Sequence, residues 1–252
     1  MKYDVMTITR GEWTLPYAIS SVHKVIPINN LIIGATSDCL ERIKNFATII
    51  FPFDESNIGK ARAEAMKYVE TPVFINVDSD VQVTPEWFEW CSKTIQEPKV
   101  AACHGFERTM GKYDPKVKER IYRSRGKGPV GFGSTFLKTS VIKKVGIPTD
   151  GGDDDVKLMH RISDAGYEWV SNINVVCHHI KNDVDCWKSY ARFASWERRL
   201  KASSKADRIE RVLLRIPYSL TAGMRKRPFM ENMYIVGVQV SLLYGKFLGT
   251  FA

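Results

Sequence analysis

The chain has 252 residues, of which 44% are hydrophobic and 26% are charged, so it is long enough for one large α/β domain with a buried core. Its five cysteines are odd in number and widely spaced, which excludes zinc-finger and redox spacings and favours reduced thiols in a cytosolic protein. No long apolar stretch follows the first strand-like segment, so a secretory signal peptide is not expected.

The net charge of +9 lies entirely at the C-terminal end. Residues 187–252 contain 13 of the 37 Lys and Arg residues but only 4 of the 28 Asp and Glu residues. The rest of the chain is therefore neutral. A neutral region followed by a basic region predicts that the basic region binds an anionic partner, either membrane lipid or nucleic acid.

Apolar runs alternate with helical patterns in the first half of the chain. Strands are predicted at residues 4–9, 31–35, 48–53, 73–77 and 100–106, and helices at 14–25, 57–69 and 85–96. Alternation of this kind indicates βαβ units and a mainly parallel sheet.

The second half begins with residues 107–135, which are rich in Lys, Arg and Gly and are expected to form a mobile loop or lid. Strand character returns at 131–137, and a short helix is predicted at 140–145. A helix at 154–165 and a strand at 169–178 complete this part of the chain.

A change to helical, basic sequence after residue 186 predicts two regions, 1–186 and 187–252. Residues 207–216 have an apolar face flanked by arginines, as in helices that lie on membranes. Residues 233–251 are mostly apolar, but polar residues and glycines interrupt them, which favours an interfacial segment over a bilayer span. A solvated helical bundle packed on the body is the alternative.

The most informative motif is Asp78-Ser79-Asp80, which ends the apolar run at 73–77. In open α/β sheets, ligands bind beyond the carboxyl ends of the strands. Two hard oxygen ligands placed there suit Mg²⁺ or Mn²⁺ holding a diphosphate. A surface turn, in which Asp is common, is the alternative.

A second acidic cluster, Asp153-Asp154-Asp155, precedes the helix predicted at 154–165. Three adjacent carboxylates repel one another and are costly to bury without a metal or a cationic partner. The dipole of a helix N-terminus helps to keep them ionised, and one of them can then act as a general base. N-capping of the helix is the alternative, although a cap needs only one Asp.

Two further segments carry candidate ligands. Asn57–Arg62 opens a helix whose amides and cations can face a phosphate, although a capped helix with solvated Lys and Arg is also possible. His178-His179 closes a strand, where an imidazole can ligate a metal or serve a structural role.

In this order, the segments resemble the family 2 glycosyltransferases, inverting enzymes with the GT-A fold, over roughly residues 3–180. The matching segments are Thr9-Arg10, Asn57–Arg62 (Asn-x-Gly-x-Ala-x-Arg in the family, here one residue shorter before the arginine), Asp78–Asp80 (Asp-x-Asp), residues 133–146 (the acceptor-side strand and the helix after it), residues 154–167 (Glu-Asp, Leu-x-x-Arg and Ala-Gly-Tyr) and the strand-end His178. Where the family commonly has Asp-Asp-Gly-Ser-x-Asp, this chain keeps only Asp38, which leaves UDP and GDP open as the nucleotide.

The resemblance implies a Rossmann-like, mainly parallel sheet with helices on both faces, followed by the basic helical tail. It implies a metal-dependent hexosyltransferase in which Asp78, Asp80 and His178 hold Mn²⁺ or Mg²⁺. Asp155 would be the catalytic base with Asp154 beside it, or would only orient an acceptor that is already an ionised phosphate. The residues assigned to the nucleotide sugar are Thr9, Arg10, Asp38, Asn57, Lys60, Arg62, Asp78 and Ser79.

The expected partners are a UDP- or GDP-sugar donor, a glycan or lipid-linked acceptor and an anionic membrane surface. The basic tail predicts a cytoplasmic protein that binds peripherally to the inner face of the cell membrane. Nucleic acid is not expected, because the tail has no recognised nucleic-acid-binding signature. Two rival functions stay open: a nucleotidyltransferase or nucleic-acid-acting metal enzyme, and a non-catalytic sugar-nucleotide-binding membrane adaptor.

Overall fold

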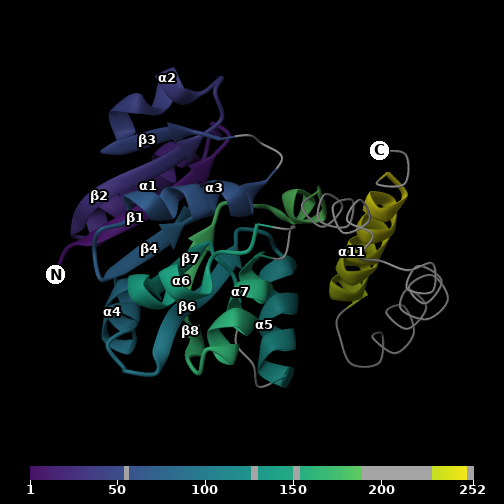
Figure 1. The fold of residues 1–252 in the computed structure, drawn as a ribbon. Coiled ribbons are helices and arrows are strands. Elements are labelled where there is room, and N and C mark those ends of the chain that lie inside the picture. Colours follow the sequence, from purple (N-terminus) through teal and green to yellow (C-terminus); the bar gives the residue numbers. More distant parts are fainter. Residues whose placement is uncertain (54–56, 126–129, 150–153, 189–228, 249–252) are drawn as a thin grey trace. The chain divides into compact units, whose positions relative to one another are not determined.

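The computed structural model describes residues 1–53, 57–125, 130–149, 154–188 and 229–248 (Figure 1). The chain divides into two compact units. The first unit comprises Met1–Arg108 and Tyr122–Ile180, and the second comprises Thr109–Ile121 and Lys181–Ala252. The helix predicted at 207–216 lies outside the described residues, as do residues 126–129 of the predicted lid.

An eight-stranded sheet in the order β3-β2-β1-β4-β7-β6-β8-β5 forms the first unit. The strands are β1 (Tyr3–Thr9), β2 (Ile28–Ala35), β3 (Ile49–Pro52), β4 (Val73–Val77), β5 (Val81–Gln82), β6 (Val100–Thr109), β7 (Ser134–Lys138) and β8 (Glu168–His179). The first four sheet neighbours, β3 to β4, pair in parallel, whereas β7 is antiparallel to both β4 and β6, and β5 is antiparallel to β8.

Helices cover both faces of this sheet. They are α1 (Leu15–Val25), α2 (Leu40–Ile43), α3 (Ile58–Ala65), α4 (Pro85–Thr94), α6 (Thr139–Val145) and α7 (Asp154–Asp164), with short 3₁₀ turns at Lys44–Phe46 and Met66–Tyr68. Helix α5 (Asp114–Arg125) begins in the second unit. Helices α1 and α4 contribute to one apolar cluster and α3, α6 and α7 to another. The predicted architecture, a mainly parallel sheet between helices, is thereby confirmed.

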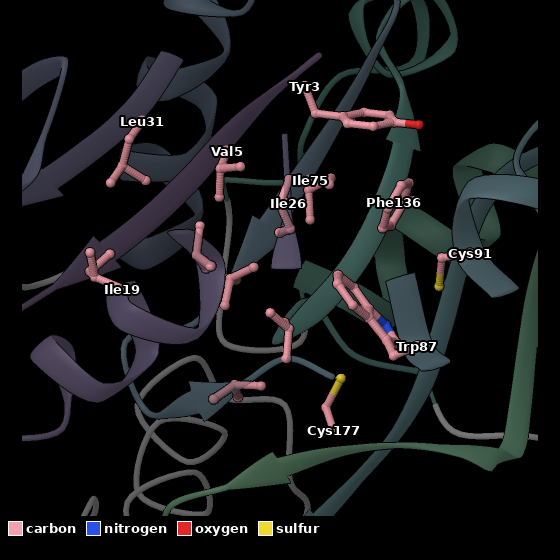
Figure 2. Packing of buried hydrophobic residues seen from close by; sticks show 14 of the residues in the cluster. Tyr3, Val5, Ile19, Ile26, Leu31, Ile75, Trp87, Cys91, Phe136 and Cys177 are labelled. Atoms are coloured by element: carbon pink, nitrogen blue, oxygen red, sulfur yellow. The ribbon is translucent and has the colours of Figure 1, made fainter. Parts of the chain in front are cut away.

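Alternation along the strands sends neighbouring residues into opposite clusters. Val5 packs in the first cluster and Met6 in the second, and Ile75 and Phe74 divide in the same way. Figure 2 shows the first cluster. This two-sided burial explains why the strands appear in the sequence as continuous apolar runs rather than as alternating ones.

Aromatic packing holds β7 against α4 within the first cluster (Figure 2). The rings of Trp87 and Phe136 meet edge to face with centroids 5.2 Å apart, and Trp87 Nε1 donates a hydrogen bond to the carbonyl of Ser134 at 3.1 Å. The five cysteines of the chain are all described, buried and unpaired, as reduced thiols would be.

The second unit joins the start of α5 to α11 (Phe229–Leu248). Buried Asp114 accepts hydrogen bonds from Thr109 at 2.7 Å and from Tyr234 at 2.5 Å. Arg120 forms an ion pair with Glu231 at 2.6 Å. Within the described ranges, no helix combines the length and the apolar character needed to cross a membrane.

The second unit combines segments that lie far apart in the sequence. Residues 109–121 and 181–186 belong to the same unit as the C-terminal region. One cause is Asp183, whose carboxylate accepts hydrogen bonds from the backbone amides of Lys112 and Asp114, both at 2.9 Å. These contacts are invisible in the local sequence pattern because about 70 residues separate the partners.

Candidate active site

Arg62 joins the two acidic segments of the sequence. Its Nη1 donates to Asp154 Oδ2 at 2.6 Å, and its Nη2 donates to Asp78 Oδ1 at 3.0 Å. Burial disfavours the charged guanidinium, which is 7% exposed, but the charges of Asp78 and Asp154 outweigh this effect and raise the pKa of Arg62 above its ordinary value. The permanent cation therefore fixes both carboxylates in one place.

Packing of α3 and α7 sets this arrangement. Gly59, Ala61 and Ala65 bury one face of α3, and Arg62 points inward with them. Helix α7 docks through Leu158 and Ile162, both 0% exposed, and burying each side chain stabilises the fold by about 1.5–3 kcal/mol. The first turn of α7 thereby carries its two acidic residues to Arg62.

Asn57 caps the start of α3 and binds a distant part of the backbone. Its Oδ1 caps the helix by accepting from the Lys60 amide at 2.9 Å, and its Nδ2 donates to the Thr149 carbonyl at 2.6 Å. A Cβ at Gly59 would lie 2.3 Å from the Pro148 carbonyl, so glycine permits this close approach. Asn57 and Gly59 thus hold the segment that leads into the acidic cluster.

Asp78 is oriented by its neighbours. Asn76 Nδ2 donates to Asp78 Oδ1 at 3.2 Å and to the Phe132 carbonyl at 2.7 Å, and the Arg62 guanidinium lies 4.4 Å from the centre of the Phe132 ring. The Asp78 amide donates to Gly133 at 2.9 Å. One oxygen of Asp78 is therefore engaged by Arg62 and Asn76, while the side chain stays 33% exposed.

Asp80 meets His179 where β5 pairs with β8. Val81 lies opposite His179 in this pairing, and the Ile180 amide donates to the Asp80 carbonyl at 2.7 Å. His179 Nε2 lies 3.1 Å from Asp80 Oδ1. This nitrogen is buried and has no hydrogen-bond partner among the residues that the structure describes, so the contact is close but lacks hydrogen-bond geometry.

His178, the predicted metal ligand, is exposed and lies opposite Gln82 in the same strand pairing. Successive residues of a strand point to opposite faces, so the side chain that faces Asp80 belongs to its neighbour His179. The described residues contain no cluster of three or more His, Cys, Asp or Glu side chains arranged to hold a metal ion.

Asp155 stands beside the Arg62 group with a different environment. Its Oδ1 accepts from the Val156 amide at 2.8 Å. Burial, together with the negative charges of Asp154 and Glu107, raises the pKa of Asp155 to about 6, although this amide and Arg62 act in the opposite direction. Asp155 is thus a carboxylate that can exchange a proton near neutral pH. Asp153 lies outside the described residues.

Glu107, on β6, is a site residue that the sequence analysis missed. Its Oε1 accepts from Ser134 Oγ at 3.2 Å, and its Oε2 lies 3.5 Å from His179 Nδ1. Buried His104 lies behind it, with Nδ1 3.9 Å from Glu107 Oε1. Burial lowers the pKa of His104, so this imidazole is neutral at pH 7.

Glu12 is a second missed residue and ties the end of β1 to the Asp78–Asp80 turn. Its Oε2 accepts from Thr9 Oγ1 at 2.6 Å, from the Arg10 amide at 2.9 Å and from Ser79 Oγ at 3.1 Å. Three residues predicted to bind the nucleotide sugar therefore gather around one carboxylate.

Lys60 and Asp38, like His178, are predicted site residues that stay on the surface. Both are exposed, Lys60 in the first turn of α3 and Asp38 shortly after β2. A hydrogen bond from the Thr36 side chain lowers the pKa of Asp38, which keeps this carboxyl ionised.

Part of the sequence matches a known protein family, and the fold resembles that of solved structures. Residues 23–146 match the family model described as Glycosyl transferase family 2. No curated protein matches the sequence. The fold is similar to that of the mannosyltransferase PcManGT from Pyrobaculum calidifontis, solved in complex with GDP-Man and Mn²⁺ (TM-score 0.66, 14% identity, 96% of this chain and 87% of that chain).

Two other solved structures share the fold at similar sequence identity. Glucosyl-3-phosphoglycerate synthase from Mycobacterium tuberculosis, in complex with Mn²⁺, UDP and phosphoglyceric acid, has a TM-score of 0.54 and 14% identity over 71% of each chain. TarS from S. aureus has a TM-score of 0.54 and 12% identity over 98% of this chain and 55% of that chain.

Proposed function

Because the chain contains a glycosyl transferase family 2 domain over residues 23–146, with the GT-A fold, we propose that it moves a hexose from a nucleotide-diphosphate sugar to an acceptor with inversion at the anomeric carbon. One observation carries this assignment: Arg62 binds Asp78 of the first acidic segment and Asp154 of the second. The residues proposed for the donor and those proposed for the acceptor thus belong to one site.

Asp80 and His179 are the proposed protein ligands of a divalent cation. Two neighbouring ligands of an octahedral cation, each about 2.1 Å from it, lie about 3 Å apart. The 3.1 Å between His179 Nε2 and Asp80 Oδ1 fits this spacing, and this buried nitrogen has no hydrogen-bond partner among the described residues that would compete with a cation. An imidazole ligand favours Mn²⁺ over the harder Mg²⁺.

The donor would supply further ligands to the cation, because the described side chains form no cluster of three or more metal ligands. Diphosphate oxygens and water are the usual companions of such ions. The bound cation would offset the charge that builds on the departing nucleoside diphosphate. Complexes of two proteins with this fold contain GDP-Man or UDP together with Mn²⁺, which supports this donor class.

Asp155 is the proposed general base. With a pKa of about 6 it is ionised at pH 7 and still basic enough to accept the proton of an acceptor hydroxyl. Asp154 is occupied by Arg62 and therefore cannot take this role. The charges of Asp154 and Glu107 make the acceptor side acidic, which favours a neutral hydroxyl acceptor such as a glycan over an anionic phosphate.

The second unit is proposed to bind an anionic membrane surface. Met230, Met233, Val240 and Tyr244 recur at helical spacing on α11 and are 41–58% exposed. All of the net charge of +9 lies in the region that contains this helix. Each Lys or Arg near an anionic leaflet contributes about 1 kcal/mol, so an exposed apolar stripe in a region with this net charge supports peripheral binding at the cytoplasmic side of the cell membrane.

A thermal-shift screen of UDP- and GDP-sugars with and without Mn²⁺ tests the donor assignment. A ligand at about 100 times its Kd stabilises the folded state by about 2.7 kcal/mol, so one donor should raise Tm in a Mn²⁺-dependent way. Release of the nucleoside diphosphate would separate an enzyme from a binding adaptor. Stabilisation by none of these donors, together with salt-dependent binding of DNA or RNA, would favour the nucleic-acid enzyme instead.

A further inference from the structure

We propose that Glu107 is a positioning residue that fixes the tautomer and orientation of His179, so that Nε2 of His179 is presented to the cation. The inference rests on the cation site of the proposed function. It gives a role in the cation site to a residue that no motif indicates and whose negative charge also acts on Asp155.

The imidazole of His179 lies between two carboxylates. Glu107 Oε2 is 3.5 Å from Nδ1, and Asp80 Oδ1 is 3.1 Å from Nε2. A neutral imidazole carries one N–H, and a metal ligand must keep its lone pair on the nitrogen that faces the metal. At 3.5 Å the Glu107 carboxylate acts electrostatically rather than through a full hydrogen bond. When a cation bound at Asp80 offsets the charge of that carboxylate, the charge of Glu107 favours the tautomer with the proton on Nδ1, which leaves Nε2 to the cation.

Glu107 is itself held in place. Ser134 Oγ donates to Oε1 at 3.2 Å, and the side chain is 18% exposed. A Cβ at Gly133 would lie 2.3 Å from Oε1 and 2.7 Å from Cδ of Glu107, so only glycine leaves room for this carboxylate. Glu107 and His179 stand on β6 and β8, which are neighbours in the sheet. Rigid elements therefore support both partners.

A purely structural ion pair with His104 does not account for Glu107. The distance from His104 Nδ1 to Oε1 is 3.9 Å, and Nδ1 lies closer to the Ser134 carbonyl, at 3.3 Å. His104 is neutral at pH 7 because burial lowers its pKa. The ring that the Glu107 charge can orient is therefore that of His179. Carboxylates behind metal-ligating histidines typically change metal affinity 10- to 100-fold when they are removed.

The test measures Mn²⁺ affinity of the full-length protein by the electron paramagnetic resonance signal of free Mn²⁺, in the presence of GDP and, separately, UDP. Glu107→Gln should weaken Mn²⁺ binding about 10- to 100-fold. Gly133→Ala should weaken it similarly, because the new methyl group displaces a Glu107 carboxylate that is still present. Glu89→Gln, the same change at an exposed position of α4, is the matched control and should have no effect.

A second readout replaces Mn²⁺ by the diamagnetic Mg²⁺, again with GDP or UDP. Long-range ¹H–¹⁵N spectra of histidine-labelled protein in this state should show His179 with its proton on Nδ1, and Glu107→Gln should abolish this preference. Wild-type Mn²⁺ affinity in Glu107→Gln, alongside loss of affinity in His179→Ala, would overturn the role of Glu107 and leave the cation site standing. Unchanged affinity in both His179→Ala and Asp80→Ala would instead overturn the cation site and, with it, this inference.

Discussion

Arg62 and Asp154 form a buried ion pair with a 2.6 Å contact, although 92 residues separate them in the chain. The pair fastens the first turn of α7 to the middle of α3, and the same guanidinium reaches Asp78. Neither carboxylate could be held here at low cost without the cation, because burial of unpaired charge is strongly unfavourable. Removing Arg62 therefore affects both halves of the site at once.

Arg62→Ala is expected to destabilise the protein by about 3–5 kcal/mol, because it leaves Asp154 and Asp78 without their shared partner. Lys60→Ala, on the same helix but exposed, is the control and should change stability by less than about 0.5 kcal/mol. Urea unfolding of the two variants measures the difference. Equal stabilities would show that the ion pairs do not hold the site together.

Asp155→Asn should retain donor binding and lose sugar transfer by a factor of about 10²–10⁴, the usual contribution of a general base. The amide keeps the shape of the side chain but cannot accept the proton. Asp164→Asn, at the other end of α7 and exposed, should transfer sugar at the wild-type rate. Undiminished transfer by Asp155→Asn would exclude Asp155 as the base.

The raised pKa of Asp155 predicts a pH dependence of activity. The value of kcat/KM should rise with pH through about 6 and level off near pH 7, as the carboxyl loses its proton. A pH profile of the initial rate measures this limb. The same rise centred near pH 4, the ordinary range of an aspartate, would show that the environment of Asp155 does not act as described.

The free energy of unfolding should depend on Asp155 in the opposite direction: it should fall, while activity rises, as this carboxyl loses its proton. A carboxyl with a raised pKa binds its proton more tightly in the folded state, so its contribution to stability is lost as pH rises from about 4 to about 6. Asp155→Asn removes this loss. The variant should therefore be more stable than the wild type at pH 7, and the difference should shrink towards pH 4 in parallel urea titrations.

The exposed apolar side chains of α11 (Met230, Met233, Val240 and Tyr244) predict membrane binding that depends on their apolar character. Replacing Met230 and Met233 together by Glu should reduce sedimentation with phosphatidylserine vesicles on the order of tenfold or more, because two buried side chains are lost and charge is added. Replacing both by Leu keeps the stripe apolar and should preserve binding. Equal sedimentation of the two double variants would remove α11 from the membrane contact.

Much of the fold could be predicted from local sequence. Strands buried on both faces give unbroken apolar runs, so β1 and β4 are visible in the sequence at nearly their observed bounds. Helix α5 was not predicted, because its sequence is dominated by charged residues and has little apolar periodicity. Its first turn is stabilised by Asp183, a contact from a distant part of the chain.

The site could be predicted where a residue follows a strand or opens a helix. Asp78 and Asp154 belong to this class, and Arg62 lies one turn into its helix. The sequence analysis assigned His178 to the metal, whereas His179 is the histidine that lies near Asp80. Local sequence does not separate the two, because the outcome depends on strand register, and a shift of one residue exchanges the two faces. Glu107 and Glu12 are isolated glutamates whose importance comes from partners far apart in sequence, such as Gly133 and Ser79.

The central claim is that the acidic site binds its donor through a divalent cation. It is tested most directly by isothermal titration of the Asp80→Ala variant with GDP- and UDP-sugars, with and without Mn²⁺. The wild-type protein should bind one of these donors in a Mn²⁺-dependent manner, Asp80→Ala should lose that dependence, and Asp164→Ala should behave as the wild type does. Donor affinity that is the same in Asp80→Ala and the wild type, at every Mn²⁺ concentration, would contradict the claim.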